Sequence, residues 1–335
     1  MQTTIIKHAS KNLPKHILSV SQFTKQQVLQ YIKRASELKQ NKQHISFPDK
    51  TLLTMFYEPS TRTSCSFQAA ALKLDCKIIS MTDKASSSQK GETLEDTIKT
   101  LNYYADAIVL RHPEKGSAKK AAQVSRIPII NAGDGNGEHP TQALLDIMTI
   151  YTELQERNID ITSATREPIT ITFVGDLKNS RTIHSLIHIL ALFPNMHFIF
   201  IAPPSIEMPE EIIAELDATQ IQHTSSITLN VAIPITDVLY MTRIQKERFQ
   251  VARDYYSVVL SHNFKNYCIN KETIQETKST AIIMHPLPRS DEIHTDVDDD
   301  PRAMYMTQVE NGLYMRMAIL ETIFSKQENQ ENQEK

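Results

Sequence analysis

Short apolar runs alternate with helical stretches along most of the chain, and this alternation constrains the fold more than any other feature. The runs 52–57, 169–174 and 281–284 end at turn-forming residues, as buried strands do. Amphipathic stretches such as 25–39, which Thr24 opens with a capping-box pattern, separate such runs. Because strands that alternate with helices pair in parallel, the pattern predicts an α/β fold with doubly wound parallel sheets.

The same alternation predicts the remaining elements and a division into two domains. The other expected strands are 77–81, 106–110, 128–132, 197–201 and 237–241, and the other expected helices are 92–104, 118–124, 140–150, 210–216 and 313–324. The 335 residues are enough for two hydrophobic cores, and the polar stretch 154–167 separates two strand–helix series. We therefore expect one domain over 1–150 and a second over 151–302, joined by long helices. The tail 326–335 contains only Lys, Gln, Glu and Asn and is expected to be disordered.

A polar cluster, Ser60-Thr61-Arg62-Thr63, follows the first apolar run at an expected strand-to-helix turn. Pro59 can end the strand because it has no N–H for the ladder, and serine and threonine favour helix starts. The free N–H groups and the positive dipole end of such a helix attract anions, and the Arg62 guanidinium matches phosphate oxygens. Taken alone, the cluster fits a helix cap with one surface arginine equally well.

The composition argues against several classes of protein. A formal net charge of −3 gives no basic surface for nucleic acid, and no apolar run approaches the roughly 20 residues of a membrane span. Three scattered cysteines form neither a disulfide framework nor a thiolate zinc site, which favours a reducing, cytoplasmic setting. The dinucleotide, P-loop and zincin motifs are absent from the sequence. We therefore expect no cofactor, no metal, no nucleic-acid partner and no membrane partner.

Cations recur at the ends of the expected strands, where doubly wound sheets bind their ligands. They are Arg62, Arg111, Lys178 or Arg181, Arg243 and Arg289, with Lys90 and His139 on nearby loops. One such arginine is usually a surface residue, but this many in two domains favours a cleft for strongly anionic substrates. No Ser-His-Asp, Cys-His or paired-carboxylate pattern stands out, so positioning and electrostatic stabilisation would have to carry catalysis.

Seven motifs in sequence order resemble those of the catalytic chains of the aspartate carbamoyltransferase family. They are Ser60-Thr61-Arg62-Thr63, Lys90-Gly91-Glu92-Thr93, Arg111-His112-Pro113, His139-Pro140-Thr141-Gln142, Gly175-Asp176-Leu177-Lys178, Tyr240 to Arg248, and His285-Pro286-Leu287-Pro288-Arg289. The resemblance runs from His16 to Phe324. Asn179-Ser180 departs from the family pattern, which often has an aromatic residue or His followed by Gly or Ser, without affecting the expected chemistry.

The resemblance implies that carbamoyl phosphate reacts with L-aspartate to give N-carbamoyl-L-aspartate and phosphate, an early step of pyrimidine biosynthesis. The residues it implies for carbamoyl phosphate are Ser60, Thr61, Arg62, Thr63, Arg111, His139, Gln142, Pro286 and Leu287, of which Arg62, Thr63, Arg111 and His139 are catalytic. For aspartate it implies Lys90, Arg181, Arg243 and Gln245. It further implies the carbamoyltransferase fold, in which a helix near 303–325 packs back on the first domain.

The resemblance also implies a homotrimer with shared active sites, in which Ser86 and Lys90 reach into the site of the neighbouring subunit. Closure of the polar loop 82–91 would then bring one more cation to the substrates and exclude water. Nothing in the sequence resembles a regulatory zinc module, so any regulatory or partner chain would be separate.

Three alternatives remain open from the sequence. An ornithine carbamoyltransferase would be expected to have His-Pro-Cys-Gln at 139–142 and His-Cys-Leu-Pro at 285–288, and ornithine would be a poor partner for Arg243. A non-catalytic scaffold with the same fold would have no need of the intact cationic residues. A Rossmann dehydrogenase lacks its glycine fingerprint here, although the fold alone would not exclude it.

Overall fold

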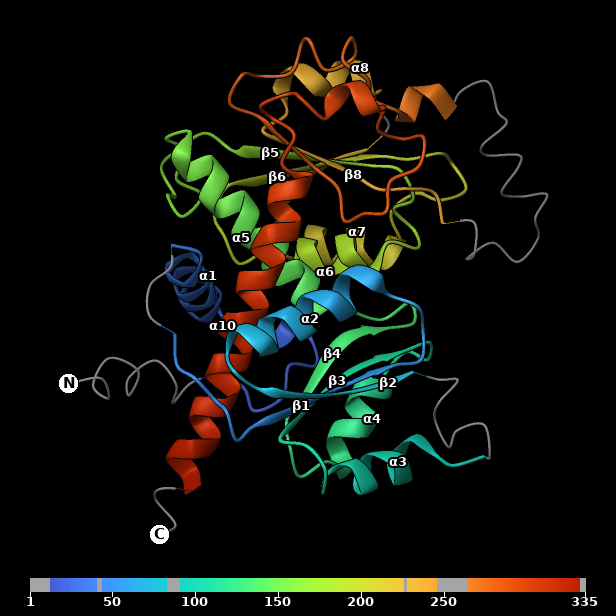
Figure 1. The fold of residues 1–335 in the computed structure, drawn as a ribbon. Coiled ribbons are helices and arrows are strands. Elements are labelled where there is room, and N and C mark those ends of the chain that lie inside the picture. The colour runs from blue at the N-terminus through green and yellow to red at the C-terminus, as the bar shows by residue number, and fades with distance from the viewer. Residues whose placement is uncertain (1–12, 41–43, 83–90, 226–227, 246–263, 332–335) are drawn as a thin grey trace. The chain divides into compact units, whose positions relative to one another are not determined.

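The computed structural model describes residues 13–40, 44–82, 91–225, 228–245 and 264–331 (Figure 1). The chain divides into two compact units, one of residues 1–145 and 309–335 and the other of residues 146–308. The boundaries fall inside the long helices α5 (Pro140–Glu156) and α10 (Tyr305–Glu331), so the first unit ends a few residues before the predicted position 150. No helix in the described ranges is both long and apolar enough to cross a membrane.

The first unit is built on a four-stranded parallel sheet in the order β2-β1-β3-β4. Its strands are β1 (Thr51–Phe56), β2 (Lys77–Thr82), β3 (Ala107–His112) and β4 (Ile129–Asp134), and its other helices are α1 (Lys25–Lys39), α2 (Thr61–Lys73), α3 (Leu94–Leu101) and α4 (Ser117–Val124). Alternate residues of β1 and β3, such as Leu53 and Ile108, pack on α3 and α4 in a buried cluster. Figure 1 shows α2 on the opposite face of this sheet.

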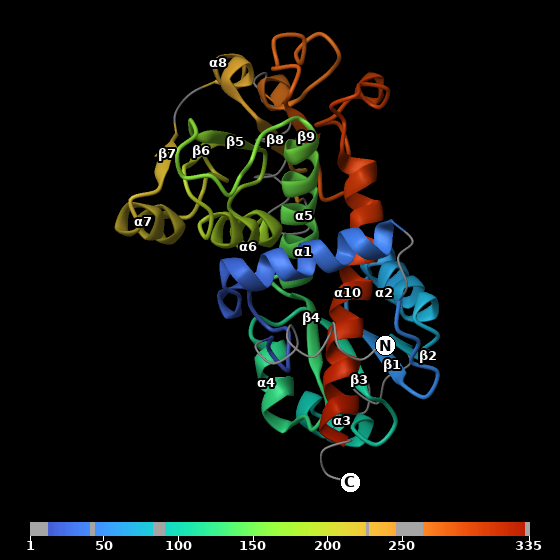
Figure 2. The ribbon, with the colours of Figure 1, turned by 90° about the vertical axis from the view of Figure 1, so that its left-hand side faces the viewer.

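The second unit is built on a five-stranded parallel sheet in the order β7-β6-β5-β8-β9, which Figure 2 shows in that sequence. Its strands are β5 (Ile169–Val174), β6 (Met196–Ile201), β7 (Gln222–Thr224), β8 (Val238–Met241) and β9 (Ile282–Met284). Its other helices are α6 (Arg181–Leu190), α7 (Glu210–Ala218) and α8 (Leu229–Ala232). Short 3-10 turns lie at Ile233–Ile235, Phe264–Tyr267 and Thr295–Val297. Helix α8 covers one face, where Ile199 and Leu239 are buried, and α6 and α7 cover the other.

The predicted fold class is therefore confirmed, because both sheets are parallel and helices cover both of their faces. The capping box at Thr24 is formed and opens α1 at the predicted residue. Strand β7 has no counterpart among the predicted strands, because its three residues are too short to show a period. Helix α5, which was predicted to end at Ile150, continues to Glu156 and so enters the polar stretch 154–167.

The tail differs from the expected disorder as far as Glu331, because α10 continues to this residue, whereas residues 332–335 lie outside the described residues. Its last described turns are held by tertiary contacts that composition does not show. The Lys326 ammonium donates to the carbonyl of Leu13, and the Gln327 side-chain amide donates to the carbonyl of Asp106 at 2.8 Å. Polar composition predicted disorder because it supplies no apolar surface, but docking against the first unit fixes these turns through hydrogen bonds.

Candidate functional site

Both sheets reverse the direction of their strand order at one position, and four of the predicted arginines lie on the strands and segments beside these positions. In the first sheet the reversal lies between β1 and β3, and in the second it lies between β5 and β8. Ligands of open parallel sheets bind outside the carboxyl ends of the strands at such a switch point, since the two outgoing chains diverge and leave a crevice. The segment after β1 carries Arg62, whereas the segments after β5 and β8 carry Arg181 and Arg243.

The turn from β1 to α2 has the features of an anion site. Ser60 has an extended backbone, and in the described chain its side chain makes no capping hydrogen bond to α2. The first turn of α2 carries Arg62 and no acidic residue, so the positive end of the helix dipole is reinforced rather than neutralised. Thr63 is buried, while Thr61 and Arg62 are exposed. The uncapped amides and the guanidinium can therefore bind a phosphate group.

Arg111 is brought beside this turn by strand pairing. It is paired in register with Phe56, and its carbonyl accepts the N–H of Tyr57 at 2.9 Å. Its Nε lies 3.4 Å from Glu58 Oε2, and its Nη1 lies 3.4 Å from the carbonyl oxygen of Ala132. The prediction placed Arg111 after the end of a strand, whereas it lies inside β3. Glu58 is a charged partner of Arg111 that the sequence did not reveal, although it stands only two residues before the motif.

His139 and Gln142 belong to the first turn leading into α5. The N–H groups of Gln142 and Ala143 both donate to the His139 carbonyl, which fixes this residue at the start of the helix. The His139 ring is buried, and its Nδ1 lies 3.5 Å from the hydroxyl oxygen of Thr141.

In the second unit a buried carboxylate, Asp176, joins the two loops at the switch point. Asp176 Oδ1 accepts from the Asn179 N–H at 3.0 Å, and its Oδ2 accepts from the Gln245 N–H at 3.2 Å. Burial raises the pKa of Asp176, while these donors and the positive charge of Arg243 oppose that effect. The loop that leads to Arg181 is therefore tied to the loop that carries Arg243. The sequence did not single out Asp176 for this function.

The two predicted aspartate-binding arginines stand on these loops. Arg181 is the first residue of α6 and is buried, and Arg243 follows β8 and is half-buried. Lys178, the alternative cation of this loop, is exposed. Gln245 contributes its main-chain N–H to Asp176, a contact that the motif did not reveal.

Gly175 allows the two loops to approach closely. It has a φ of 119°, and a Cβ built on it would lie 2.0 Å from the carbonyl oxygen of Thr242. We expect Gly175→Ala to lower the free energy of unfolding by about 3 kcal/mol, because it adds a backbone overlap to an unfavourable φ. Urea denaturation measures this loss. Gly116 has a φ of 83° and no atom within 4 Å of its Cβ position, so Gly116→Ala should cost only about 1–2 kcal/mol. Equal losses would contradict this explanation.

The loop after β9 carries Pro286 and Leu287. Leu287 has a φ of 54°, a conformation that residues with a side chain rarely adopt, and its bond to Pro288 is cis. His285 is buried, with Nε2 at 2.7 Å from Glu292 Oε1 and Nδ1 accepting the Leu287 N–H at 2.8 Å. The ring therefore links the loop to a buried carboxylate.

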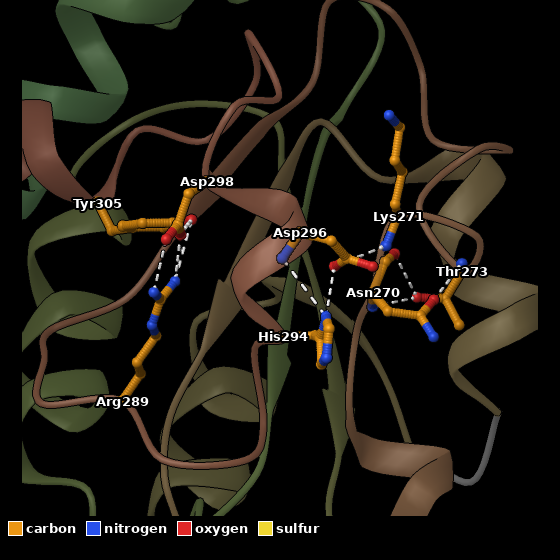
Figure 3. Close-up of polar contacts among 8 residues, drawn as sticks. All are labelled: Asn270, Lys271, Thr273, Arg289, His294, Asp296, Asp298 and Tyr305. Atoms are coloured by element: carbon orange, nitrogen blue, oxygen red, sulfur yellow. Dashed lines mark hydrogen bonds and ion pairs between the residues drawn. The ribbon is translucent and has the colours of Figure 1, made fainter.

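Arg289 has a different environment from the one that its position in sequence predicted. Figure 3 shows its guanidinium directed at Asp298, with Tyr305 beside it. Arg289 Nη2 lies 2.7 Å from Asp298 Oδ2, Nη1 contacts Oδ1, and the Tyr305 hydroxyl donates to the same carboxylate. The pair lowers the pKa of Asp298 to about 2. Arg289 is thus paired with a carboxylate of its own unit, a partner that the sequence did not reveal, and its place among the cations for an anionic substrate stays a prediction.

The same figure shows a second polar group on the neighbouring segments, around His294 and Asp296. His294 Nδ1 lies 3.0 Å from Asp296 Oδ1, and Asp296 Oδ1 also accepts the N–H of Lys271 at 3.2 Å. Asn270 and Thr273 exchange hydrogen bonds beside it at 2.8 and 2.9 Å. These contacts connect the chain that follows the His285 loop to the rest of the unit.

Two predicted residues, Ser86 and Lys90, lie outside the described residues. The other predicted residues fall into two groups. Ser60, Thr61, Arg62, Thr63, Arg111, His139 and Gln142 belong to the first unit, and Arg181, Arg243, Gln245, Pro286 and Leu287 belong to the second. Each group gathers cationic and N–H donors, as binding of anionic groups requires.

The chain matches two profiles of one protein family. These are "Aspartate/ornithine carbamoyltransferase, carbamoyl-P binding domain" over residues 15–152 and "Aspartate/ornithine carbamoyltransferase, Asp/Orn binding domain" over residues 167–323. The chain is 45% identical over 314 residues to the multifunctional protein pyr1-3 of Dictyostelium discoideum, with 92% of this chain covered but only 13% of that protein. It is 44% identical to the aspartate carbamoyltransferase catalytic subunit of Methanocaldococcus jannaschii, with 94% of this chain and 100% of that protein covered.

Solved structures agree with the sequence relatives. The catalytic subunit of M. jannaschii aspartate transcarbamoylase superposes with a TM-score of 0.83 at 43% identity, covering 94% of this chain and 99% of that one. Aspartate transcarbamoylase from Trypanosoma cruzi in complex with N-(phosphonacetyl)-L-aspartic acid gives 0.83 at 36% identity, covering 94% and 97%. The chain therefore belongs to the aspartate/ornithine carbamoyltransferase family, on its aspartate carbamoyltransferase side, which confirms the resemblance drawn from its motifs.

Proposed function

We propose that this chain transfers the carbamoyl group of carbamoyl phosphate to the amine of L-aspartate, giving N-carbamoyl-L-aspartate and phosphate in pyrimidine biosynthesis. The observation that carries the proposal is the placement of cationic donors at the switch points of both sheets, in a chain whose relatives carry the aspartate carbamoyltransferase name. The unit with α2 is proposed to bind carbamoyl phosphate, and the unit with Asp176 to bind aspartate.

Phosphate binding is assigned to the turn between β1 and α2. The main-chain N–H groups of the first turn and the hydroxyls of Ser60, Thr61 and Thr63 would donate to the phosphate oxygens. Arg62 would add two parallel N–H donors and a full positive charge, which a backbone site lacks. This arrangement also lowers the barrier to reaction, because phosphate leaves with its developing charge already matched by donors.

The carbonyl oxygen of the carbamoyl group is assigned to Thr63, Arg111 and His139, with Gln142 beside them. When the deprotonated amine of aspartate attacks the carbonyl carbon, the C–N bond forms and negative charge develops on this oxygen. Donors fixed in advance stabilise that charge without reorganisation, and one such donor typically lowers the barrier by about 3–4 kcal/mol. Collapse then breaks the bond to phosphate, and the departing phosphate can take the amine proton. His139 serves as a donor in this scheme rather than as a base.

The two carboxylates of aspartate are assigned to Arg181 and Arg243, with Gln245 nearby. A dicarboxylate needs two cationic forks at a fixed separation, and Asp176 ties together the two loops that present them. Ornithine offers one carboxylate and an ammonium, so a second arginine would repel its far end. This charge argument favours aspartate over ornithine as the acceptor.

The proposal extends to the assembly. We propose a cytoplasmic homotrimer in which Ser86 and Lys90 of one subunit complete the site of the next, with any regulatory or partner chain being separate. It is supported by the motif Lys90-Gly91-Glu92-Thr93, whose last three residues lead into α3. Mixing Lys90→Ala subunits with Arg62→Ala subunits tests it: shared sites would restore part of the activity in mixed trimers, and separate sites would not.

The deciding experiment supplies carbamoyl phosphate with either L-aspartate or L-ornithine and follows both carbamoylated products. Carbamoyl-aspartate alone is the expected product. Formation of carbamoyl-ornithine alone would show that the chain is an ornithine carbamoyltransferase. Failure to form either product, with phosphate still bound, would indicate a scaffold protein without activity.

Replacement of Asp176 tests the link between the two arginine loops. Asp176→Ala removes the acceptor for the Asn179 and Gln245 N–H groups, so Arg181 and Arg243 should lose their fixed separation. We expect KM for aspartate to rise about tenfold, the effect of losing one net hydrogen bond, with KM for carbamoyl phosphate unchanged. Steady-state kinetics with each substrate varied measures this. Asp217→Ala, which removes an exposed partner of His223, is the matched control.

A further inference from the structure

The loop after β9 adopts a conformation that its own sequence does not favour. Leu287 has a φ of 54°, which for a residue with a Cβ costs about 1–2 kcal/mol. Such a conformation persists only where neighbouring groups hold it. The side chain of His285 is placed to do so, because it contacts the Leu287 N–H with one ring nitrogen and Glu292 with the other.

The hydrogen bonds of His285 fix its tautomer. Its Nδ1 accepts the N–H of Leu287, so Nδ1 cannot carry a proton. The proton must then be on Nε2, which donates to Glu292 Oε1 at 2.7 Å. Glu292 Oε1 also accepts the N–H of Ser290 at 3.0 Å, and the His285 N–H donates to the Gln308 side chain at 3.1 Å. Three hydrogen bonds thus hold His285, and in one of them its Nδ1 is the acceptor for the loop N–H.

The charges around the ring favour this neutral tautomer. Burial lowers the pKa of His285, with Arg243 and Arg289 acting in the same direction, and Glu292 opposes them. For Glu292, burial raises the pKa, but the hydrogen bond from His285, the attraction to that ring and the main-chain N–H donors together outweigh it, so the pKa lies below its ordinary value. The pair is therefore a neutral imidazole and a carboxylate. A protonated ring would turn Nδ1–H toward the Leu287 N–H, and the two donors would repel.

We propose that His285 is a positioning residue for carbamoyl transfer: its Nδ1, which Glu292 keeps unprotonated, holds the main chain of Leu287, a residue that the family resemblance assigns to carbamoyl phosphate, so that its carbonyl can accept an N–H of the carbamoyl amide. This rests on the proposed function. Without the Nδ1 contact, Leu287 would relax toward negative φ and its carbonyl would turn. The loop would then lose its affinity for an amide nitrogen but not for phosphate.

Arg289 anchors the far end of the same loop and gives a contrast. It is held by Asp298 and stacks on Tyr305, with its guanidinium carbon 5.5 Å from the ring centroid (Figure 3). These contacts hold a side chain two residues beyond Leu287 and make no bond to the Leu287 main chain. Asp298→Asn should therefore lower stability more than it changes recognition of the amide.

Two substitutions at His285 separate its two nitrogens. His285→Asn places Oδ1 near the position of Nδ1, where it can accept the Leu287 N–H as in an Asx turn, but it loses Glu292. His285→Gln places an amide N–H₂ near the position of Nε2, where it can donate to Glu292, but it offers no acceptor to Leu287. Both variants are neutral, so they differ in geometry and not in charge.

The measurement is calorimetric binding of two probes to the full-length protein. The probes are a carboxamide phosphonate, which carries an amide nitrogen and cannot react, and inorganic phosphate, which lacks it. We expect His285→Gln to bind the carboxamide about tenfold more weakly, the loss of one neutral hydrogen bond, and phosphate as wild type does. His285→Asn should retain most of the carboxamide affinity, and its kcat should exceed that of His285→Gln.

The outcomes are distinguishable. Equal carboxamide affinities in the two variants, or a parallel loss of phosphate affinity, would overturn the proposal that His285 positions Leu287. The proposed function would still stand in that case if the wild-type protein formed carbamoyl-aspartate. Absence of that product from wild type would overturn both. Thermal unfolding reports whether the variants fold. If either does not, Glu292→Gln, which keeps an acceptor for Nε2–H, and Glu292→Leu, which removes it, replace the pair, and only the second should lose carboxamide affinity.

Discussion

Replacing Arg111 with alanine should lower kcat for carbamoyl transfer by about 10²–10³-fold, the usual effect of removing one donor to a developing oxyanion. Arg111 lies at the end of β3 beside the β1–α2 turn, with its carbonyl tied to Tyr57 and its guanidinium beside Glu58. Its removal would also leave the Glu58 carboxylate without this cation near a phosphate, so KM for carbamoyl phosphate should rise as well. Steady-state kinetics with carbamoyl phosphate varied separates the two effects.

A matched control for this substitution is Arg126→Ala. Arg126 is an exposed arginine of the same unit, with its guanidinium 5.6 Å from the ring centroid of Tyr103. Losing it changes the net charge by the same amount without touching the switch point, so kcat and KM should remain at wild-type values. If Arg126→Ala and Arg111→Ala slowed the reaction equally, long-range charge rather than a specific donor would explain both results.

Replacing Arg243 with alanine should reduce kcat/KM for aspartate by about 10²–10³-fold, because a charge-assisted pair to a carboxylate typically contributes several kcal/mol when desolvated. Binding of phosphate alone should not change, since Arg243 belongs to the other unit. The measurement is kcat/KM with aspartate varied at saturating carbamoyl phosphate, together with phosphate binding by calorimetry.

Two further variants sharpen the Arg243 result. Arg243→Lys keeps the positive charge but loses the planar fork, so it should recover only part of the lost kcat/KM. Lys265→Ala removes an exposed cation from the same unit and should leave aspartate kinetics unchanged. Full recovery in Arg243→Lys would show that charge alone, and not a bidentate contact, recognises the carboxylate.

The contrast between Arg289 and Arg243 shows what the motifs could and could not reveal. Both follow strands of the same sheet, and sequence placed both among the cations of an anion site. Arg243 lies at the switch point, whereas Arg289 follows the edge strand β9 and is paired with Asp298, which also accepts a hydrogen bond from Tyr305. Sequence spacing gives the position of a side chain along the chain. It does not identify the residues that pair with that side chain, because these depend on how the following segment folds back against the loop.

The order of strands and helices followed from the sequence by itself, because the alternation of apolar residues is a local property set by the periods of strand and helix. The motif Ser60-Thr61-Arg62-Thr63 likewise predicted an anion-binding turn, since strand, proline and helix-start residues are neighbours in the chain. Only the tertiary structure placed Arg111 beside Glu58, tied Asp176 to Gln245 across 69 residues, and linked Leu287 to Glu292 through His285. These contacts depend on strand order and loop return, which bring distant residues together through the packing of the whole unit and leave no periodic signal in the sequence.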